Sequence, residues 1–272
     1  MMMSKKNMSK KNISWPTLYQ VFLLVLMYVP IVVVTVYSFN VSKTTTTWGG
    51  WTLDWYRKMA KNRSLLEALK NSLVLAVLSS AAAGVIGTLG AVGMARVEWK
   101  SKGAIEYIST LPIMIPEIIL GMVFMAFFAM LGLPFGMVTL VIGHTTFCIP
   151  YVFMMVKSSL VGIDKSLGEA AKDLGASERR AFFDITLPLI TPAVISGMLL
   201  AFAMSLDDVV ISIFVTGART NTLPIRIYTQ LKSGVTPEIN ALCTIMLVVT
   251  FVLVGVSRLL QYTGQKSYYR VK

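Results

Sequence analysis

Three acidic residues in apolar sequence have the clearest potential for chemistry: Glu117 and the neighbouring pair Asp207 and Asp208. A carboxylate at the centre of a membrane helix costs on the order of 3 kcal/mol on insertion scales, so such groups normally face a partner or a watery path. A layer of carboxylates suits a linear polycation, which regains part of its lost hydration energy by ion pairing, whereas sulfate would be repelled. We therefore predict that Glu117 and Asp207 or Asp208 line a substrate path.

The two neighbouring acids cannot play the same part. Adjacent side chains on a helix point about 100° apart, so Asp207 and Asp208 cannot both face a narrow path. The other is left to cap a helix end or to bind an outer loop. A different interpretation pairs the acids with Arg219, Arg226 or a partner subunit, in which case they only hold the fold.

The remaining polar residues offer little catalytic chemistry. His144 is the only histidine, and its apolar surroundings favour hydrogen-bonded helix packing over pH sensing or substrate contact. Cys148 and Cys243 lie 95 residues apart in apolar runs, a spacing that suits neither a disulfide framework nor a zinc site. No nucleophile with its base and no metal-ligand cluster emerges, so we expect neither catalysis nor a cofactor in this chain.

The composition places these residues in a membrane protein. Of 272 residues, 55% are hydrophobic and 14% charged, with a mean hydropathy of +0.69, which excludes an ordinary water-soluble globule. The net charge of +12 comes from Lys and Arg in short links between apolar blocks, a distribution that disfavours nucleic-acid binding.

We predict an all-α polytopic membrane protein with six transmembrane helices, since each apolar block is long enough to cross a bilayer. The expected spans are residues 17–39, 70–95, 105–131, 136–157, 188–216 and 239–260. They form one six-helix transmembrane domain, 17–260, between short tails at 1–16 and 261–272. Four glycines in the second span predict close helix packing: Gly84, Gly87, Gly90 and Gly93.

The basic residues predict the orientation. Residues 1–16, 96–104, 157–187 and 258–272 share one side of the membrane and hold 16 of the 25 Lys and Arg residues. Positively charged links stay in the cytoplasm. We expect both termini to lie on the cytoplasmic side of a plasma (inner) membrane.

The link at 158–187 is unusually long for a compact membrane bundle, which indicates work outside the bilayer. Its sequence predicts a short helix from about Asp164 to Gly175, followed by a second helix capped by Ser177. Ala170 and Ala171 leave a low surface for a partner, and Glu169 adds a charge beside it.

This loop resembles the EAA signature of permease subunits in ABC importers. Its pattern is Glu169-Ala170-Ala171, three residues, Gly175, nine residues, Ile185, one residue, and Leu187-Pro188. The resemblance implies the type I importer permease fold. It also implies that the loop couples the membrane helices to a separate ATPase subunit through Glu169, Ala170, Ala171, Gly175, Leu187 and Pro188.

Further segments look like the PotC-type spermidine/putrescine permeases: 144–151, 205–210, 224–228 and 234–241. Glu117 departs from the pattern, because aspartate is expected there more often. The resemblance implies ATP-driven polyamine import with a homologous second permease, two ATPase subunits that hold ATP and Mg²⁺, and an extracytoplasmic polyamine-binding protein.

Other functions stay open on the sequence alone. The EAA loop by itself fits an importer of another small solute. An ion-gradient-driven secondary carrier would use the same acids as proton relays, although no inverted repeat is visible. A membrane scaffold without transport activity would need none of these acids.

Overall fold

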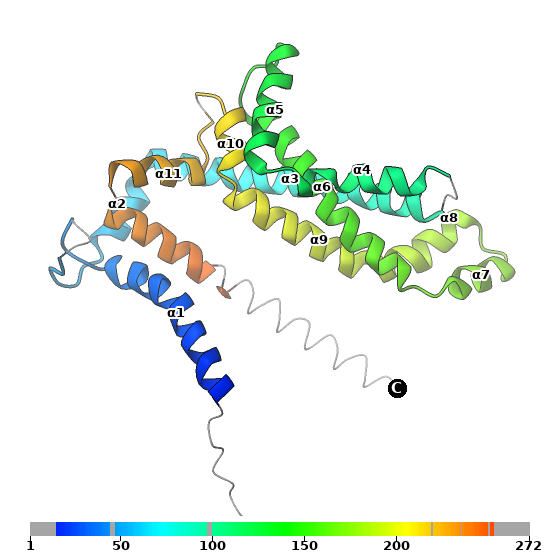
Figure 1. Ribbon diagram of the computed structural model, residues 1–272, viewed down its shortest axis with the longest axis horizontal. Coiled ribbons are helices and arrows are strands. Elements are labelled where there is room, and N and C mark those ends of the chain that lie inside the picture. Colours follow the sequence, from blue (N-terminus) through cyan, green and yellow to red (C-terminus); the bar gives the residue numbers. More distant parts are fainter. Residues whose placement is uncertain are drawn as a thin grey trace, which may run out of the picture. The chain divides into compact units, whose positions relative to one another are not determined.

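The computed structural model describes residues 15–43, 47–96, 100–218, 220–234, 236–249 and 251–252. Almost all of the predicted tail 1–16 and the whole of 261–272 lie outside this described part. The chain divides into two compact units, one formed by 1–62 with 233–272 and the other by 63–232. Each unit is described separately below (Figure 1).

The described residues confirm an all-α membrane fold. Four helices are long and apolar enough to cross a bilayer, and a bent helix pair forms a fifth candidate. The sixth predicted span, 239–260, begins in the apolar helix Pro237–Val249, and most of its second half lies outside the described residues.

In the first unit, an exposed apolar helix leads into a folded link. Helix α1 (Trp15–Tyr37) buries none of its residues, and α2 (Asp54–Lys61) follows after the link. The indole N–H of Trp55 donates to the carbonyl of Asn40 at 2.7 Å. Asn62 Nδ2 donates to Glu238 Oε1 at 2.7 Å, which joins the end of α2 to the helix Pro237–Val249.

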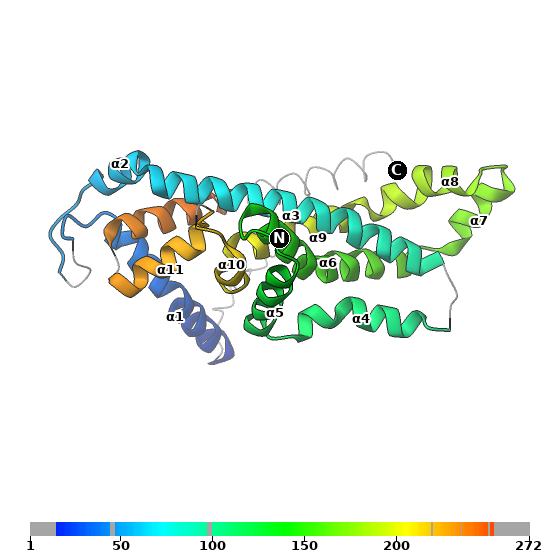
Figure 2. The same cartoon turned by 90° about the horizontal axis from the view of Figure 1, so that it is seen from above.

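In the second unit, three long helices form the core: α3 (Arg63–Arg96), α6 (Met137–Val161) and α9 (Leu187–Asp207). Figure 2 shows them running alongside one another. A Cβ added at Gly87 would lie 3.1 Å from the backbone oxygen of Ile149 and from the backbone nitrogen of Phe153. This contact confirms the predicted close packing at Gly87, whereas Gly93 has open space around it.

The third predicted span is not one helix. Helix α4 (Lys102–Met114) ends, and α5 (Glu117–Met130) begins at an angle of 104° to it. Ile115 precedes a proline and has extended backbone angles, φ −80° and ψ 128°, because the ring of Pro116 disfavours a helical residue before it. The third predicted span, 105–131, is therefore a broken span, and Pro116 separates its two parts.

The fifth predicted span, 188–216, is also divided. Helix α9 stops at Asp207, and the short α10 (Val210–Val215) follows. Helix α10 packs against α5. Helix α11 (Leu223–Ser233) then begins beside α3, where the backbone N–H of Leu223 donates to Ser72 Oγ at 2.8 Å.

Candidate functional site

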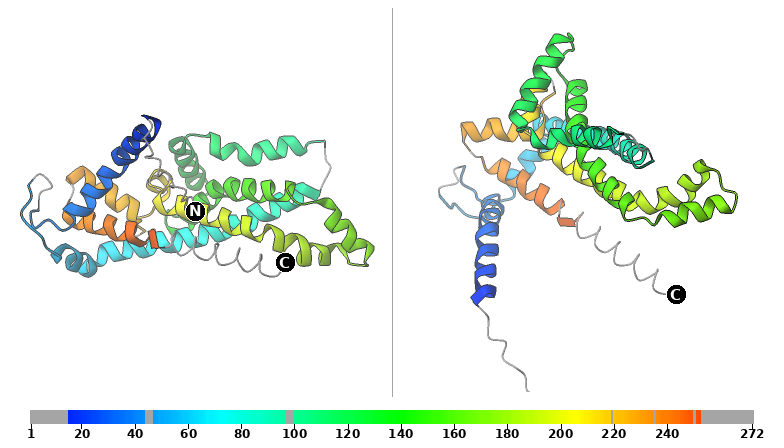
Figure 3. Two further views of the ribbon diagram at one scale, coloured as in Figure 1. Left: turned by 90° about the horizontal axis from the view of Figure 1, so that it is seen from below. Right: turned by 45° about the vertical axis from the view of Figure 1, so that its right-hand side comes forward.

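The long link between α6 and α9 folds as its sequence predicts. Helix α7 (Lys165–Asp173) and the single turn α8 (Glu178–Ala181) form a helix-turn-helix, and the π turn Phe182–Thr186 leads into α9. Figure 3 shows α7 and α8 at one end of the 63–232 unit.

Local hydrogen bonds fix both ends of this turn. The Asp164 carboxylate caps α7 by accepting the backbone N–H of Ser166 at 2.9 Å, and this bond holds the pKa of Asp164 below its usual range. Gly175 has a φ of +84°, a left-handed conformation that favours a residue without Cβ. Ser177 Oγ accepts the N–H of Arg180 at 3.3 Å and caps α8.

The loop presents a surface for contact. The side chains of Glu169 and Ala170 are exposed and Ala171 is half-buried. Leu174, at the end of α7, is 90% exposed although it is apolar. Leu187 differs from these residues, because it packs against the buried core at the start of α9.

The break between α9 and α10 is built on Asp208. Its Oδ1 accepts the backbone N–H of Ile211 at 3.2 Å, and its Oδ2 accepts that of Ser212 at 2.9 Å. Asp208 is 8% exposed, whereas Asp207 is exposed. The structure thus confirms that one acid of the pair caps a helix end.

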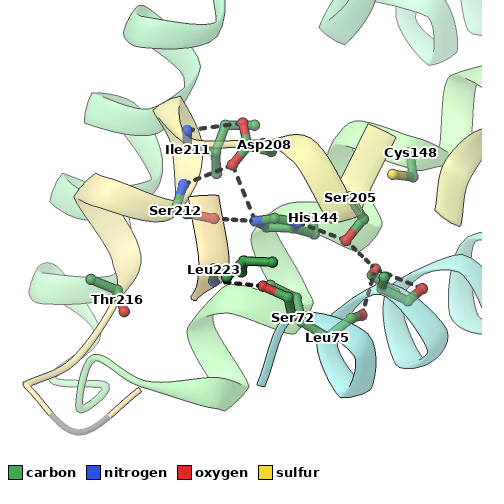
Figure 4. Close-up of polar contacts among 12 residues, drawn as sticks. Ser72, Leu75, His144, Cys148, Ser205, Asp208, Ile211, Ser212, Thr216 and Leu223 are labelled. Carbon is green, nitrogen blue, oxygen red and sulfur yellow. Dashed lines mark hydrogen bonds and ion pairs between the residues drawn. The ribbon is translucent and has the colours of Figure 1, made fainter. Parts of the chain in front are cut away.

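A buried polar network joins this break to the core (Figure 4). His144 is completely buried. Its Nδ1 lies 2.8 Å from Ser205 Oγ, and its Nε2 lies 2.9 Å from Ser212 Oγ and 3.3 Å from Asp208 Oδ2. Ser79 Oγ donates to Ser205 Oγ at 2.9 Å and extends the network to α3. The hydrogen-bonded packing role predicted for His144 is confirmed.

Glu117 belongs to the same neighbourhood. It is the first residue of α5 and is exposed. Helix α10, whose first turn binds the Asp208 carboxylate, packs against α5. The fold brings the three predicted acids near one another, with two exposed and one buried.

Among the described residues, no arginine forms an ion pair with Glu117, Asp207 or Asp208. Arg219 lies outside the described residues. Within the part of the chain that the structure describes, the ion pair recorded for these three acids joins Asp208 to His144. Arg226 makes no ion pair there, and its Nε is buried without a hydrogen-bond partner.

Sequence reasoning missed the serines of the network, Ser79, Ser205 and Ser212. They lie on α3, α9 and α10 and meet only in the folded chain. Serine is common in apolar helices, where its hydroxyl can bond to its own backbone. The one available signal was the position of Ser205, two residues before the first acid of the pair, Asp207.

Comparison with known proteins identifies the fold and the family. The family described as "Binding-protein-dependent transport system inner membrane component" matches residues 83–264. Chains of solved ABC transporters share the fold at low identity. A chain from a bacterial ABC transporter that imports alginate gives a TM-score of 0.70 at 14% identity, covering 90% of this chain and 94% of that one. A chain of the MetNI methionine transporter gives 0.59 at 20% identity, covering 71% and 92%.

Curated relatives are much more similar in sequence. The spermidine/putrescine transport system permease protein PotC of Escherichia coli (strain K12) is 43% identical over 234 residues, or 86% of this chain and 89% of that protein. The putrescine permease PotI of the same strain is 40% identical over 228 residues, 81% of each. The chain therefore belongs to the binding-protein-dependent inner membrane components, the multi-pass permeases that work with other subunits of ABC importers, and within them to the PotC-type permeases.

Proposed function

We propose that this chain is the polyamine-conducting permease subunit of an ATP-driven importer for spermidine or putrescine. The observation that carries the proposal is the identity of 43% and 40% to permeases named for these substrates, over more than four-fifths of the chain. An importer of another small solute is the alternative.

The exposed carboxylates of Glu117 and Asp207 would meet the transported cation. Neither has an ion-pair partner within the described residues. An ammonium group that sheds water on entering the membrane recovers part of that cost beside an unpaired carboxylate. Asp208 would keep the shape of this site, because its oxygens already accept hydrogen bonds from α10.

The energy would come from a partner. Glu169, Ala170, Ala171 and Gly175 would seat the α7–α8 loop in a cytoplasmic ATPase, with exposed Leu174 adding an apolar contact. Leu187 and Pro188 would transmit movement of the loop to α9. In this proposal ATP and Mg²⁺ bind the ATPase, and this chain needs no cofactor of its own.

The complete importer would contain a second, homologous permease, two ATPase subunits and an extracytoplasmic polyamine-binding protein. Both termini of this chain would face the cytoplasm, on the side of the α7–α8 loop. ATP binding would close the ATPase pair, and the loops would carry this closure to the membrane helices. Such switching requires contacts that differ between the two states.

The test is uptake of labelled spermidine, putrescine and sulfate by vesicles containing the reconstituted importer. We expect ATP-dependent uptake of a polyamine and none of sulfate. Glu169→Lys should abolish uptake while ATP hydrolysis continues, whereas Glu67→Lys, the same change at an exposed position outside the loop, should not. Normal uptake by Glu169→Lys contradicts the coupling role.

A second comparison tests the cation site. Glu117→Gln and Asp207→Asn should raise the polyamine concentration needed for half-maximal uptake and leave assembly of the complex intact. Transport of both variants with unchanged concentration dependence would assign these acids to the fold instead.

A further inference from the structure

We infer that His144 is a positioning residue: it holds Asp208 on the first turn of α10 and thereby sets the geometry of the α9–α10 break beside the cation site. It acts on transport through Asp208 and does not contact the transported solute. The inference rests on the proposed function for its transport readout, and its geometry is that of Figure 4.

The network fixes which nitrogen of His144 carries the hydrogen. The Asp208 carboxylate only accepts hydrogen bonds, so a bare Nε2 at 3.3 Å from Oδ2 would set two lone pairs against each other. Nε2 therefore carries the hydrogen, with Ser212 Oγ at 2.9 Å and Asp208 Oδ2 at 3.3 Å as its neighbours. With the hydrogen on Nε2, Nδ1 accepts from Ser205 Oγ at 2.8 Å. The Ser79 hydroxyl lies 2.9 Å from Ser205 Oγ and also reaches the Leu75 carbonyl at 2.7 Å.

Both carboxylate oxygens of Asp208 have polar partners in this arrangement. Its two oxygens accept the N–H groups of Ile211 and Ser212 and face the His144 Nε2 hydrogen. A buried carboxylate in an apolar core is stable only with such partners, because desolvation of the charge is otherwise costly. Removal of the His144 donor leaves Asp208 under-compensated, and we expect the cap to loosen.

The network spans the helices whose arrangement shapes the cation site. Ser79 lies on α3, His144 on α6, Ser205 on α9, and Ser212 on α10. Helix α10 packs on α5, where a Cβ added at Gly121 would lie 2.6 Å from the Phe214 ring. Because Glu117 starts α5, a displaced α10 would also move Glu117.

A serine, a histidine and an aspartate in one network also occur in hydrolases. Here Ser205 is 2% exposed and His144 is completely buried. The Ser205 hydroxyl is enclosed between α3, α6 and α9, so a scissile bond cannot reach it. Its surroundings support positioning and not nucleophilic attack.

Two near-isosteric variants separate the two sides of the imidazole. The amide nitrogen of His144→Gln can occupy the place of Nε2 and donate to Asp208. His144→Asn retains an acceptor for Ser205 but does not reach Asp208. We expect Gln to retain most of the maximal uptake rate and Asn to lose about tenfold or more, the factor for one lost charge-assisted hydrogen bond.

The variants are measured in the reconstituted importer, with assembly checked by co-purification. In His144→Asn the half-saturating polyamine concentration should rise together with the loss of rate, because a displaced α10 would also move Glu117, whereas His144→Gln should stay near the wild-type value. The double variant His144→Asn with Asp208→Asn should transport no less than Asp208→Asn alone. An equal loss of uptake rate in His144→Gln and His144→Asn would overturn the inference. So would a double variant in which the two losses multiply, or a change in the half-saturating concentration without a change in the maximal rate.

A spectroscopic test does not depend on the solute. The chain contains one histidine, so an importer in which this chain alone carries ¹⁵N-histidine gives one imidazole signal pair. We expect the Nε2–H tautomer and a shift of that signal in Asp208→Asn. The Nδ1–H tautomer overturns the inference, whereas absence of polyamine uptake by the wild-type importer overturns only the proposed function.

Discussion

Close packing of α3 on α6 gives a prediction that a matched pair of glycines can test. In Gly87→Ala, the new Cβ would lie 3.0 Å from Val152 Cβ and 3.1 Å from backbone atoms of Ile149 and Phe153. Backbone atoms cannot rotate away as a side chain can, so the helices must separate by a few tenths of an ångström. Overpacking of this kind costs about 1–3 kcal/mol.

Gly93→Ala is the control, because nothing lies within 4 Å of its added Cβ. Both glycines lie in α3, so the gain of about 1 kcal/mol from replacing a helical glycine by alanine is common to the two variants. The difference in their unfolding free energies therefore isolates the packing term. We expect Gly87→Ala to be less stable than Gly93→Ala by about 1–3 kcal/mol.

The assay is SDS titration of the purified chain in mixed micelles, followed by circular dichroism. Uptake should fall with Gly87→Ala and remain normal with Gly93→Ala. Equal stability of the two variants would refute the argument, because it would mean that α3 and α6 do not approach as closely as the structure places them.

Two further predictions concern polar contacts. Lys157 Nζ binds Glu106 Oε2 at 2.7 Å and joins α4 to α6, with both side chains partly exposed. We expect Lys157→Met to lower the unfolding free energy by about 0.5–1 kcal/mol in the same titration, and an unchanged value would contradict this contribution. Asp164→Ala should speed hydrogen exchange of the α7 amides, while Asp164→Ser, which still caps, should not. Since the pKa of Asp164 is lowered, its cap is complete at neutral pH and is lost only as the pH falls through that value; equal exchange in the Ala and Ser variants would refute the capping role.

The sequence predicted the fold of the α7–α8 loop in detail because local signals determine it. The Asp164 cap, the left-handed Gly175 and the Ser177 cap each act within a few residues of chain. Such interactions are visible without knowledge of the tertiary fold. The same reasoning located Gly87 on a close-packed helix, but it could not tell Gly87 from Gly93, since this difference depends on where α6 lies.

The helix breaks were harder to predict. Pro112 and Pro116 both lie in the third predicted span, yet α4 continues through Pro112 and ends before Pro116. The break after Asp207 carries no glycine or proline, so no backbone signal marks it. It depends on a side chain, because Asp208 can cap α10 only where His144 and the serines of other helices receive it.

The two breaks explain how acids are tolerated in this part of the membrane domain. A helix N-terminus presents unpaired N–H groups and the positive end of the helix dipole, so a carboxylate is favoured there. Glu117 is the first residue of α5, and Asp208 caps α10. Asp207 is instead the last residue of α9, at the negative end of a helix, where a carboxylate is disfavoured.

This difference predicts opposite effects of neutralising the neighbouring acids. Asp207→Asn removes an unfavourable dipole interaction and should raise the unfolding free energy by about 0.3–1 kcal/mol. Asp208→Asn loses charge-assisted hydrogen bonds to α10 and His144 and should lower it by about 1.5–3 kcal/mol. SDS titration of both variants measures these changes, with uptake of polyamine followed in parallel. If Asp207→Asn stabilises the protein but weakens transport, Asp207 is retained for the solute and not for the fold. If Asp207→Asn instead destabilises the protein, the reason to assign the cation to Asp207, and not to Asp208, is lost.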